Sequence, residues 1–305
     1  MKLISSLEKF NPNYYYITKK NAPGILIIHE NGKKEIFYDR LSGKRKKFEW
    51  KNFDKLIRGK NVEVDAKNMS ASHYIKIEKK AGRVEDVSEE LFVKRMVKKP
   101  EEVEKIKKAS KIAKEIILEA GGEAKKGMRE SEIEKMLRMK ALERNVELAY
   151  EPIVAADENS AIPHTTAGDR RVRGVLLIDF GVRYKHYCSD ISQVFFFENK
   201  KAKGEYEKIE NAFYEIADGL DGCKTGEDVH TLHLCLFKKL KIKKMPHSIG
   251  HGIGLEVHEF PRLKKGSIDR VAGSVMALEP AVYYARRYGL RFEREVWVGK
   301  KPMVL

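Results

Sequence analysis

Two aspartates near the middle of the chain are the first residues that could do chemistry. Asp179 ends the apolar run Val175–Ile178. A bare carboxylate there is unfavourable unless it lies at an exposed strand end or has a partner. Asp190 follows eleven residues later, and a hairpin could bring the two carboxylates side by side. Close carboxylates repel each other, so a shared cation would stabilise them. The alternative is two unrelated surface acids.

A second group of candidates is the histidine-rich segment that contains His247, His251 and His258. Three glycines flank the middle histidine closely: Gly250, Gly252 and Gly254. A lone histidine is more often structural than a ligand, but three of them with this much glycine favour a functional site. The segment is not an HExxH zinc motif, because no histidine stands three places after Glu259.

The third group is a pair of glutamates in strand-like apolar surroundings. Glu279 lies between Leu278 and Pro280, and Glu293 follows Phe292. For Glu293, a salt bridge with Arg291 is the structural alternative. Four carboxylates and one imidazole exceed what one metal ion can use, but two ions with bridging carboxylates could use them all. Oxygen ligands suit Mn²⁺ or Fe²⁺, and one imidazole keeps Co²⁺ or Zn²⁺ open. Such a pair would ready a bridging hydroxide for attack on a carbonyl.

Strands and helices must position these groups. Apolar extended runs at 175–181, 184–197, 275–279 and 290–298 predict strands. Pro100 with Glu101 and Glu102 predicts a helix start, since proline and acids suit the first turn. Apolar spacing predicts that this helix continues to the Gly121-Gly122 pair and that further helices span about 129–144, 204–219 and 226–240.

The first third of the chain reads as a small α/β domain. Residues 14–18, 24–28, 61–65 and 74–78 are β-rich runs, and Asn31-Gly32 predicts a hairpin. A boundary falls near residues 85–99. We therefore expect an α/β (α+β) protein with a small N-terminal domain, 1–92, and a larger second domain, 93–305.

Composition restricts the classes of partner. The chain has 305 residues and a net charge of +16, concentrated in residues 1–95, where 22 Lys and Arg face 13 Asp and Glu. A solvated Lys-rich surface accounts for this excess; attraction to nucleic acid is the alternative, but no aromatic-basic motif supports it. We expect no nucleic-acid partner. The three cysteines lack CxxC spacing, and no signal peptide or apolar 18-residue run is present, so we expect a cytoplasmic protein with no membrane partner.

The ordered set of motifs resembles a known family. An Asp, a second Asp eleven residues on, the segment Gly250-His251-Gly252-Ile253-Gly254-Leu255, the His258-Glu259 pair, Glu279-Pro280 and Arg291-Phe292-Glu293 resemble the M24 pita-bread metallopeptidases. That family includes prolidase and Xaa-Pro aminopeptidase. The resemblance covers about residues 95–305. It implies a pita-bread catalytic domain behind a small creatinase-like N-terminal domain, which methionine aminopeptidases typically lack.

The resemblance also implies roles for individual residues. It implies a metal-ligand set of Asp179, Asp190, His251, Glu279 and Glu293. Glu279 would also be the general base. The catalytic histidines would be His164 and His258, which stabilise the tetrahedral intermediate, and the substrate-binding residues would be His247, Arg262 and Arg291. Of these, Arg262 could meet a substrate carboxylate, and Arg291 could order Glu293. This chain departs from the family pattern at Ser192, Ala281 and Arg294, and none of these changes removes a ligand.

The function implied is a dinuclear-metal exopeptidase that hydrolyses Xaa-Pro bonds by attack of a metal-bridging hydroxide. Its cofactors would be two divalent ions, Mn²⁺ or Co²⁺ first, with Fe²⁺ or Zn²⁺ open, and its partner a peptide with proline second. The family also implies a homodimer. Dipeptidase and aminopeptidase activities are both compatible with these residues. The alternatives are a methionine aminopeptidase-like enzyme or a non-catalytic basic pita-bread binding protein.

Overall fold

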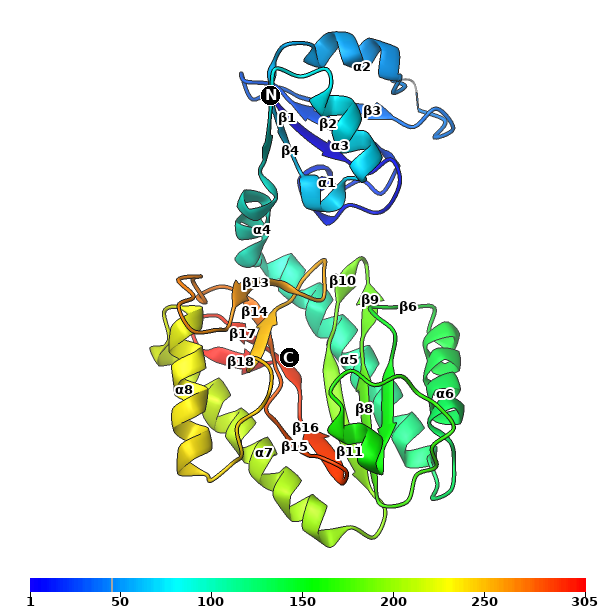
Figure 1. The fold of residues 1–305 in the computed structure, drawn as a ribbon, viewed down its shortest axis with the longest axis vertical. Coiled ribbons are helices and arrows are strands. Elements are labelled where there is room, and N and C mark those ends of the chain that lie inside the picture. Colours follow the sequence, from blue (N-terminus) through cyan, green and yellow to red (C-terminus); the bar gives the residue numbers. More distant parts are fainter. Residues whose placement is uncertain (45) are drawn as a thin grey trace. The chain divides into compact units, whose positions relative to one another are not determined.

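The computed structural model describes residues 1–44 and 46–305 and divides into two compact units, Met1–Arg95 and Met96–Leu305 (Figure 1). Both units mix helices and strands, so the expected α/β (α+β) class is confirmed. Within the described part of the chain, none of the helices has the length and apolarity needed to cross a membrane.

The first unit is built on a five-stranded sheet in the order β3-β2-β1-β4-β5. The strands β1–β3 are antiparallel neighbours, whereas β4 runs parallel to β1 and to β5. The strands are β1 (Lys2–Ser5), β2 (Gly24–Ile28), β3 (Lys34–Tyr38), β4 (Asn61–Val64) and β5 (Arg83–Asp86). The helices are α1 (Pro12–Thr18), α2 (Trp50–Ile57), α3 (Ala71–Glu78) and α4 (Ser88–Met96), with a 3₁₀ turn η1 (Ala66–Asn68).

The hairpin predicted at Asn31-Gly32 is confirmed by the antiparallel pairing of β2 with β3. Two predicted strands in this unit are wrong. Residues 14–18 lie in α1, because the side chain of Asn11 caps the amides of Asn13 and Tyr14 and a proline stands at the helix start. Residues 74–78 lie in α3, which Ser70 caps. Local capping outweighed the strand preference of these β-branched and aromatic residues.

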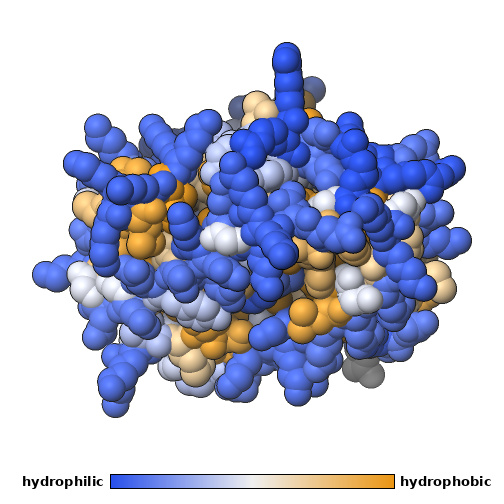
Figure 2. Space-filling view, turned by 90° about the horizontal axis from the view of Figure 1, so that it is seen from below, coloured by the Kyte–Doolittle hydropathy of each residue, from blue (hydrophilic) through white to orange (hydrophobic). Residues whose placement is uncertain are grey.

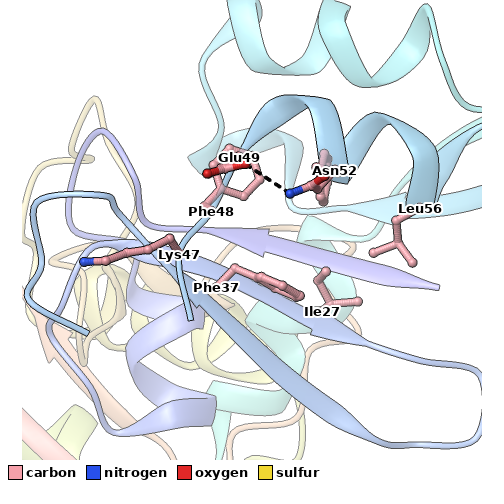
Figure 3. A pocket seen from close by; sticks show the side chains of 8 residues that line it. Ile27, Phe37, Lys47, Phe48, Glu49, Asn52 and Leu56 are labelled. Atoms are coloured by element: carbon pink, nitrogen blue, oxygen red, sulfur yellow. Dashed lines mark hydrogen bonds between the residues drawn. The ribbon is translucent and has the colours of Figure 1, made fainter. Parts of the chain in front are cut away.

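A small apolar pocket of about 190 Å³ opens in this unit beside α2 (Figure 3). Its walls are mainly apolar and include Ile27, Phe37, Phe48 and Leu56, while the amide of Asn52 donates to Glu49 at its rim (3.1 Å). Its volume is below the roughly 300 Å³ at which small-molecule sites usually begin.

The second unit contains four long helices and several short sheets (Figure 1). The helices are α5 (Pro100–Glu123), α6 (Glu130–Glu143), α7 (Lys200–Gly219) and α8 (Gly226–Lys239), with 3₁₀ turns η2 (Asp157–Ala161) and η3 (Leu220–Gly222). The strands of the first half are β6 (Glu147–Leu148), β7 (Ile153–Ala156), β8 (Val175–Phe180), β9 (Val182–Tyr184), β10 (Tyr187–Cys188) and β11 (Ile191–Phe196). Those of the second half are β12 (Gly250–Gly252), β13 (Glu259–Arg262), β14 (Val275–Leu278), β15 (Ala281–Tyr284), β16 (Tyr288–Arg291), β17 (Arg294–Val298) and β18 (Pro302–Val304).

The four predicted helices of this unit are confirmed within a few residues. The first runs past its expected stop at Gly121-Gly122 and ends at Glu123. Gly121 lies inside the helix because a larger residue would not fit there. A Cβ added at this position would lie 2.0 Å from the ring of Phe195. The predicted strands at 175–181 and 275–279 are also confirmed, whereas 184–197 and 290–298 each divide into two strands around an acidic residue.

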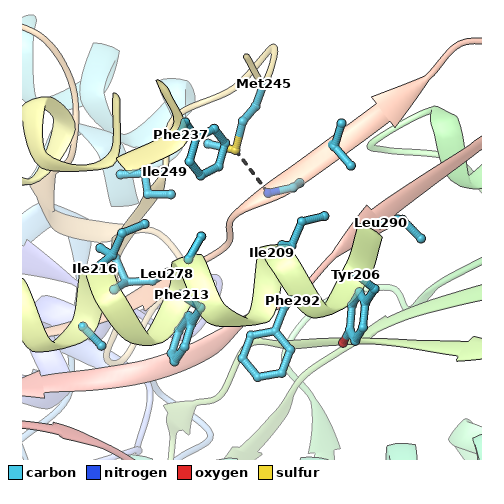
Figure 4. Packing of buried hydrophobic residues seen from close by; sticks show 14 of the residues in the cluster. Tyr206, Ile209, Phe213, Ile216, Phe237, Met245, Ile249, Leu278, Leu290 and Phe292 are labelled. Atoms are coloured by element: carbon cyan, nitrogen blue, oxygen red, sulfur yellow. Dashed lines mark hydrogen bonds between the residues drawn. The ribbon is translucent and has the colours of Figure 1, made fainter. Parts of the chain in front are cut away.

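Two apolar cores hold these strands in place. Helices α7 and α8 pack on one side, where Phe213, Ile216 and Phe237 meet Leu278 and Phe292 (Figure 4). Helices α5 and α6 pack on the other side against β7, β8 and β11. Strand β8 contributes Leu177 to the first core and Leu176 and Ile178 to the second, which explains why its run of apolar residues is continuous.

The outer surface is dominated by hydrophilic side chains. Figure 2 shows one face of the molecule, on which hydrophobic residues form only small scattered patches. This pattern agrees with a solvated, charge-rich surface.

Candidate metal and active site

Neighbouring strands bring three of the predicted residues to one place. Strand β8 pairs antiparallel with β11, so that Asp179 lies opposite Ser192. Ser192 in turn forms a bridge with Glu293, in the break between β16 and β17. Asp190 directly precedes β11. The sheet pairing therefore gathers the neighbouring carboxylates of Asp179 and Asp190 with that of Glu293, which is about a hundred residues further along the chain.

A second set of pairings adds His251 and Glu279. In β12, His251 lies opposite Ala277 of β14, and Glu279 follows the end of β14. Leu278 pairs with Arg294, which places Glu279 next to Glu293. The second half of the unit thus contributes one imidazole and two carboxylates to the same region.

The close packing of neighbouring strands explains the glycines beside His251. A Cβ on Gly250 would lie 2.0 Å from the carbonyl oxygen of Ala277, and one on Gly252 would lie 2.1 Å from that of Phe260. Either contact would force the backbone apart. The glycines are therefore required by the close approach of neighbouring strands, rather than by room for a ligand alone.

A cavity of about 390 Å³ opens over these groups. Its walls include the five predicted metal ligands: Asp179, Asp190, His251, Glu279 and Glu293. The predicted catalytic histidines, His164 and His258, and Arg291 line it as well. Both histidines are exposed, so their rings are open to a bound molecule.

Three of the five predicted ligands are already close enough to share one ion. Ligand atoms of Asp190, His251 and Glu293 all lie within 4.8 Å of one another. The Nε2 atom of His251 lies 3.5 Å from Asp190 Oδ2, and its Nδ1 lies 3.1 Å from the carbonyl oxygen of Gly252. A proton on Nδ1 would be donated to that carbonyl, which leaves Nε2 free to bind a metal.

The cavity holds more negative than positive charge. Burial raises the pKa of Glu279 to about 7, although His251 and Arg291 oppose the rise. The pKa of Glu293 is raised well above its usual range by burial and by the neighbouring carboxylates of Asp190 and Asp179. Burial also raises the pKa of Asp179, against the effect of Arg291. These four carboxylates lack enough cationic partners when no ion is bound.

The same imbalance acts on the imidazole of His251. Burial would lower its pKa, but the hydrogen bond and charge of Asp190 outweigh burial and raise the pKa to about 9. A set of four carboxylates and one imidazole around one cavity fits two divalent cations, which would neutralise the excess charge. The residues present therefore fit the predicted metals.

Arg291 is buried and has many partners. Its Nη2 donates to Asp179, its Nε donates to the hydroxyl of Ser192 (2.9 Å), and its Nη1 donates to Tyr283 (2.9 Å). The Ser192 hydroxyl donates to Glu293 (2.6 Å), whereas the guanidinium itself is 3.9 Å from that carboxylate. Arg291 thus contacts Asp179 directly and reaches Glu293 mainly through Ser192.

His247 is not among the described residues that line the cavity, although its Nδ1 lies 3.6 Å from the carboxylate of Glu279, which does line it. Its Nε2 is 2.9 Å from the Tyr283 hydroxyl, and its Nδ1 is 2.8 Å from the carbonyl oxygen of Ser248. Burial, with a contribution from Arg291, lowers its pKa to about 4, so the ring is neutral. Its predicted contact with substrate stays a prediction.

Arg262 is held by Asp269. Its Nε donates to Asp269 Oδ2 (2.8 Å) and its Nη2 to Oδ1 (3.1 Å), and the guanidinium lies over the ring of Phe260 (4.3 Å). Arg262 does not belong to the described lining of the cavity. A substrate carboxylate would have to compete with Asp269 for this side chain.

Two residues near the metal ligands carried no signal in the sequence. The hydroxyl of Tyr150 lies within hydrogen-bond distance of both Asp179 and Asp190 and can donate its single hydrogen to either, and burial together with these carboxylates raises its pKa well above the usual range. Glu295 is fully buried and accepts from the amide of Asp190 (2.7 Å) and from the hydroxyl of Ser110 (2.7 Å). Neither belongs to a motif, because their roles depend on contacts between distant segments.

Arg294, a departure from the family pattern, faces away from the ligand carboxylates. Its Nη1 donates to the carbonyl oxygens of Ser192 (2.8 Å) and Glu293 (2.6 Å), and its guanidinium stacks on Phe292. It therefore supports the backbone that presents Glu293.

Comparison with known proteins identifies the family. The sequence model of metallopeptidase family M24 matches residues 104–300. The chain is 29% identical over 319 residues to a Xaa-Pro dipeptidase of Pyrococcus horikoshii, covering 95% of this chain and 88% of the relative. It is 31% identical over 226 residues to a Xaa-Pro dipeptidase of Pyrococcus furiosus; that match covers 71% of this chain and 63% of the relative.

Solved structures show the same architecture. An X-Pro aminopeptidase from Thermotoga maritima superposes with a TM-score of 0.87 at 26% identity, covering 99% of this chain and 94% of the other. A prolidase from Pyrococcus horikoshii superposes with a TM-score of 0.86 at 26% identity, covering 99% and 92%. The predicted fold, a small α/β unit followed by a pita-bread unit, is confirmed.

Proposed function

The chain belongs to metallopeptidase family M24, and from this premise we propose that it is a metal-dependent exopeptidase that cleaves the bond between an N-terminal residue and a following proline. One observation carries the proposal: five predicted ligands and two exposed histidines line a single cavity of about 390 Å³. The relatives that are described as Xaa-Pro dipeptidases and X-Pro aminopeptidases support the substrate class.

The metal-binding groups would be Asp179, Asp190, His251, Glu279 and Glu293. When bound, two divalent ions would lower the pKa of a water molecule and polarise the scissile carbonyl. We propose Mn²⁺ or Co²⁺, since the set is mostly oxygen with one imidazole. Tyr150 would orient the carboxylates of Asp179 and Asp190, and Glu295 would hold the backbone amide of Asp190, as hydrogen-bond partners of metal ligands commonly do.

The chain's own side chains have separate tasks in this proposal. The carboxylate of Glu279 accepts the proton of the attacking water and later passes it to the leaving proline nitrogen. His164 and His258 donate hydrogen bonds to the carbonyl oxygen as negative charge develops on it. The acidic cavity also attracts the free ammonium group of the peptide.

Selectivity for peptide length would depend on Arg262. Because Asp269 already holds its guanidinium, the carboxylate of a dipeptide gains little from it. We therefore propose that dipeptides and longer Xaa-Pro peptides are both substrates. A methionine aminopeptidase-like activity is less well supported, because the relatives named above act on Xaa-Pro bonds. A non-catalytic role is also less well supported, since the chain has all five of the expected metal-ligand residues.

The direct test is hydrolysis by purified protein stripped of metal and reloaded with Mn²⁺ or Co²⁺. The substrates would be Met-Pro, Ala-Pro-Phe and Met-Ala-Ser. We expect metal-dependent cleavage of the first two, and Asp190→Asn should abolish it. Cleavage of Met-Ala-Ser alone would indicate a methionine aminopeptidase. No cleavage under any metal would overturn the proposal.

Three further expectations remain proposals. We propose that the two compact units are separate domains, with the boundary near residue 92. We also propose a homodimer and a cytoplasmic location. Size-exclusion chromatography with light scattering would test the homodimer. Limited proteolysis at the boundary would test the two domains.

A further inference from the structure

The segment that carries His164 is irregular and needs external support. It runs from the end of η2 to the start of β8, and His164 itself is exposed at the cavity. Within the described part of the chain, residues 162–174 form neither helix nor named strand. The position of the imidazole therefore depends on what holds the chain on either side of His164.

The chain on both sides of His164 is bound by one carboxylate, that of Glu130. Its Oε1 accepts from the amide of Ala156 (2.7 Å) and its two oxygens accept from the side chain of Asn159 (3.0 and 3.1 Å). Its Oε2 accepts from the amide of Gly168 (3.0 Å). The first two partners precede His164 and the third follows it, so Glu130 closes the segment into a loop.

The start of α6 adds to this clamp. Glu130 is the first residue of the helix, and its amide donates to the carbonyl oxygen of Arg170 (3.0 Å), while the amide of Ser131 donates to that of Gly168 (3.0 Å). A carboxylate is favoured at this place because the amino end of a helix is positive. The Glu130 side chain is fully buried, and none of the hydrogen-bond partners given above for it is among the described residues that line the cavity.

The donor pattern requires a carboxylate rather than an amide. Three groups donate to Glu130, and all of them are N–H donors. A glutamine has nearly the same shape, but its NH₂ group would face at least one of these donors. A buried donor left without an acceptor is unfavourable. Glu130→Gln should therefore release the chain on one side of His164, while the side chain at position 130 keeps nearly the same volume.

We propose that Glu130 is a positioning residue that holds His164 at the cavity. The proposal rests on the proposed function, in which His164 stabilises the carbonyl oxygen. Glu130 acts through the backbone of residues 156–168 and touches neither substrate nor metal. A purely structural role for Glu130 would predict a loss of stability without a specific link to His164.

A double-mutant cycle separates these two roles. The variants are Glu130→Gln, His164→Ala and the double variant, each as the full chain loaded with Mn²⁺. The matched control is Glu132→Gln, which removes the same charge two residues along α6. Its carboxylate is exposed and accepts from the amide of Arg129 (2.7 Å), and it makes none of the hydrogen bonds described above to residues 156–168. The measurements are kcat and KM for the Xaa-Pro peptide that the wild type cleaves best, with metal content and Tm.

We expect Glu130→Gln to lower kcat about tenfold or more with little change in KM, because small misplacements of a catalytic group are costly. In the His164→Ala background the same substitution should lower kcat by no more than about twofold, as coupled residues are not additive. Glu132→Gln should leave kcat unchanged. Equal fold losses in both backgrounds would overturn the proposal, as would an unchanged kcat in Glu130→Gln.

A second variant covers the case in which Glu130→Gln does not fold. Asn159→Ala removes only one of the tethers, and Asn159 is half-buried. Its smaller loss of kcat should likewise vanish in the His164→Ala background. Losses that simply multiply would count against the positioning role.

Hydrogen exchange distinguishes failure of this inference from failure of the proposed function. Peptides that cover residues 154–170 should exchange faster in Glu130→Gln than in the wild type, and Glu132→Gln should match the wild type. If the wild type cleaves no peptide, the proposed function fails, but exchange still decides whether Glu130 holds the segment. Unchanged exchange in Glu130→Gln would overturn the inference by itself.

Discussion

Arg291 and Asp179 form an almost completely buried ion pair, in which the guanidinium donates to Asp179 Oδ2 and the two side chains are 3% and 10% exposed. Removing one partner of such a pair leaves a buried charge without compensation. The pair also lies at a proposed metal ligand, so its importance should depend on whether ions are bound.

We therefore expect Arg291→Met to destabilise the metal-free protein by roughly 3–5 kcal/mol. The loss should be clearly smaller in protein loaded with Mn²⁺, because bound ions would neutralise Asp179 and Glu293. Urea unfolding with and without metal measures both values. The fluorescence of Trp297 reports the second unit if Trp50, the other tryptophan, is replaced by Phe. Equal losses in the two states would show that no ion acts on Asp179.

Metal removal should lower stability through the same carboxylates. Ligands that bind only the folded state stabilise it by about 2.7 kcal/mol at a hundred times their Kd. Mn²⁺ should therefore raise the Tm of the stripped wild type. Asp190→Asn should remove most of this rise, since Asp190 lies within 4.8 Å of His251 and Glu293 ligand atoms. Asp169→Asn is the control, because its side chain is 88% exposed. A wild-type Tm that is insensitive to Mn²⁺, Co²⁺ and Zn²⁺ would contradict the metal site.

Tyr150→Phe should weaken the same cluster by another route. The substitution removes the hydroxyl that lies between the carboxylates of Asp179 and Asp190 and donates to one of them at a time. Leaving buried acceptors unsatisfied should lower the free energy of unfolding of the metal-free protein by about 1–3 kcal/mol. It should also weaken Mn²⁺ binding, measured by isothermal titration calorimetry. Tyr214→Phe is the control, since Tyr214 is 47% exposed. Unchanged stability and affinity would argue that the hydroxyl has no role there.

His233 should make stability fall in mild acid. Burial, with His230 nearby, lowers its pKa from 6.5 to about 4. The unfolded chain therefore binds a proton between these values that the folded chain does not bind, and stability falls as pH drops from 6.5 to about 4. His233→Leu should reduce this slope. Urea unfolding at several pH values from 7 to 4 measures it, and identical slopes in the wild type and the variant would contradict the prediction.

Helices were easier to predict than strands. The pattern beginning at Pro100 is local, because proline, two acids and the apolar spacing all lie within one segment. The same locality explains the error at residues 14–18. The cap at Asn11 made that segment a helix. The strand prediction rested on its aromatic and β-branched residues and did not take the cap into account.

The sequence by itself determined the types of residue at the site. Asp179, His251 and Glu293 stand in apolar or glycine-rich surroundings that few structural roles explain, and their order along the chain can be read directly from the sequence. Tertiary structure decided which groups share the cavity. The pairing of β8 with β11 brings together Asp179 and Ser192, which are 13 residues apart. The bridge from Ser192 to Glu293 joins segments about a hundred residues apart. Tyr150, Glu295 and Glu130 act only through such long-range contacts. Because hydrogen bonds and burial depend on distance in space and not on spacing along the chain, no local pattern could identify them.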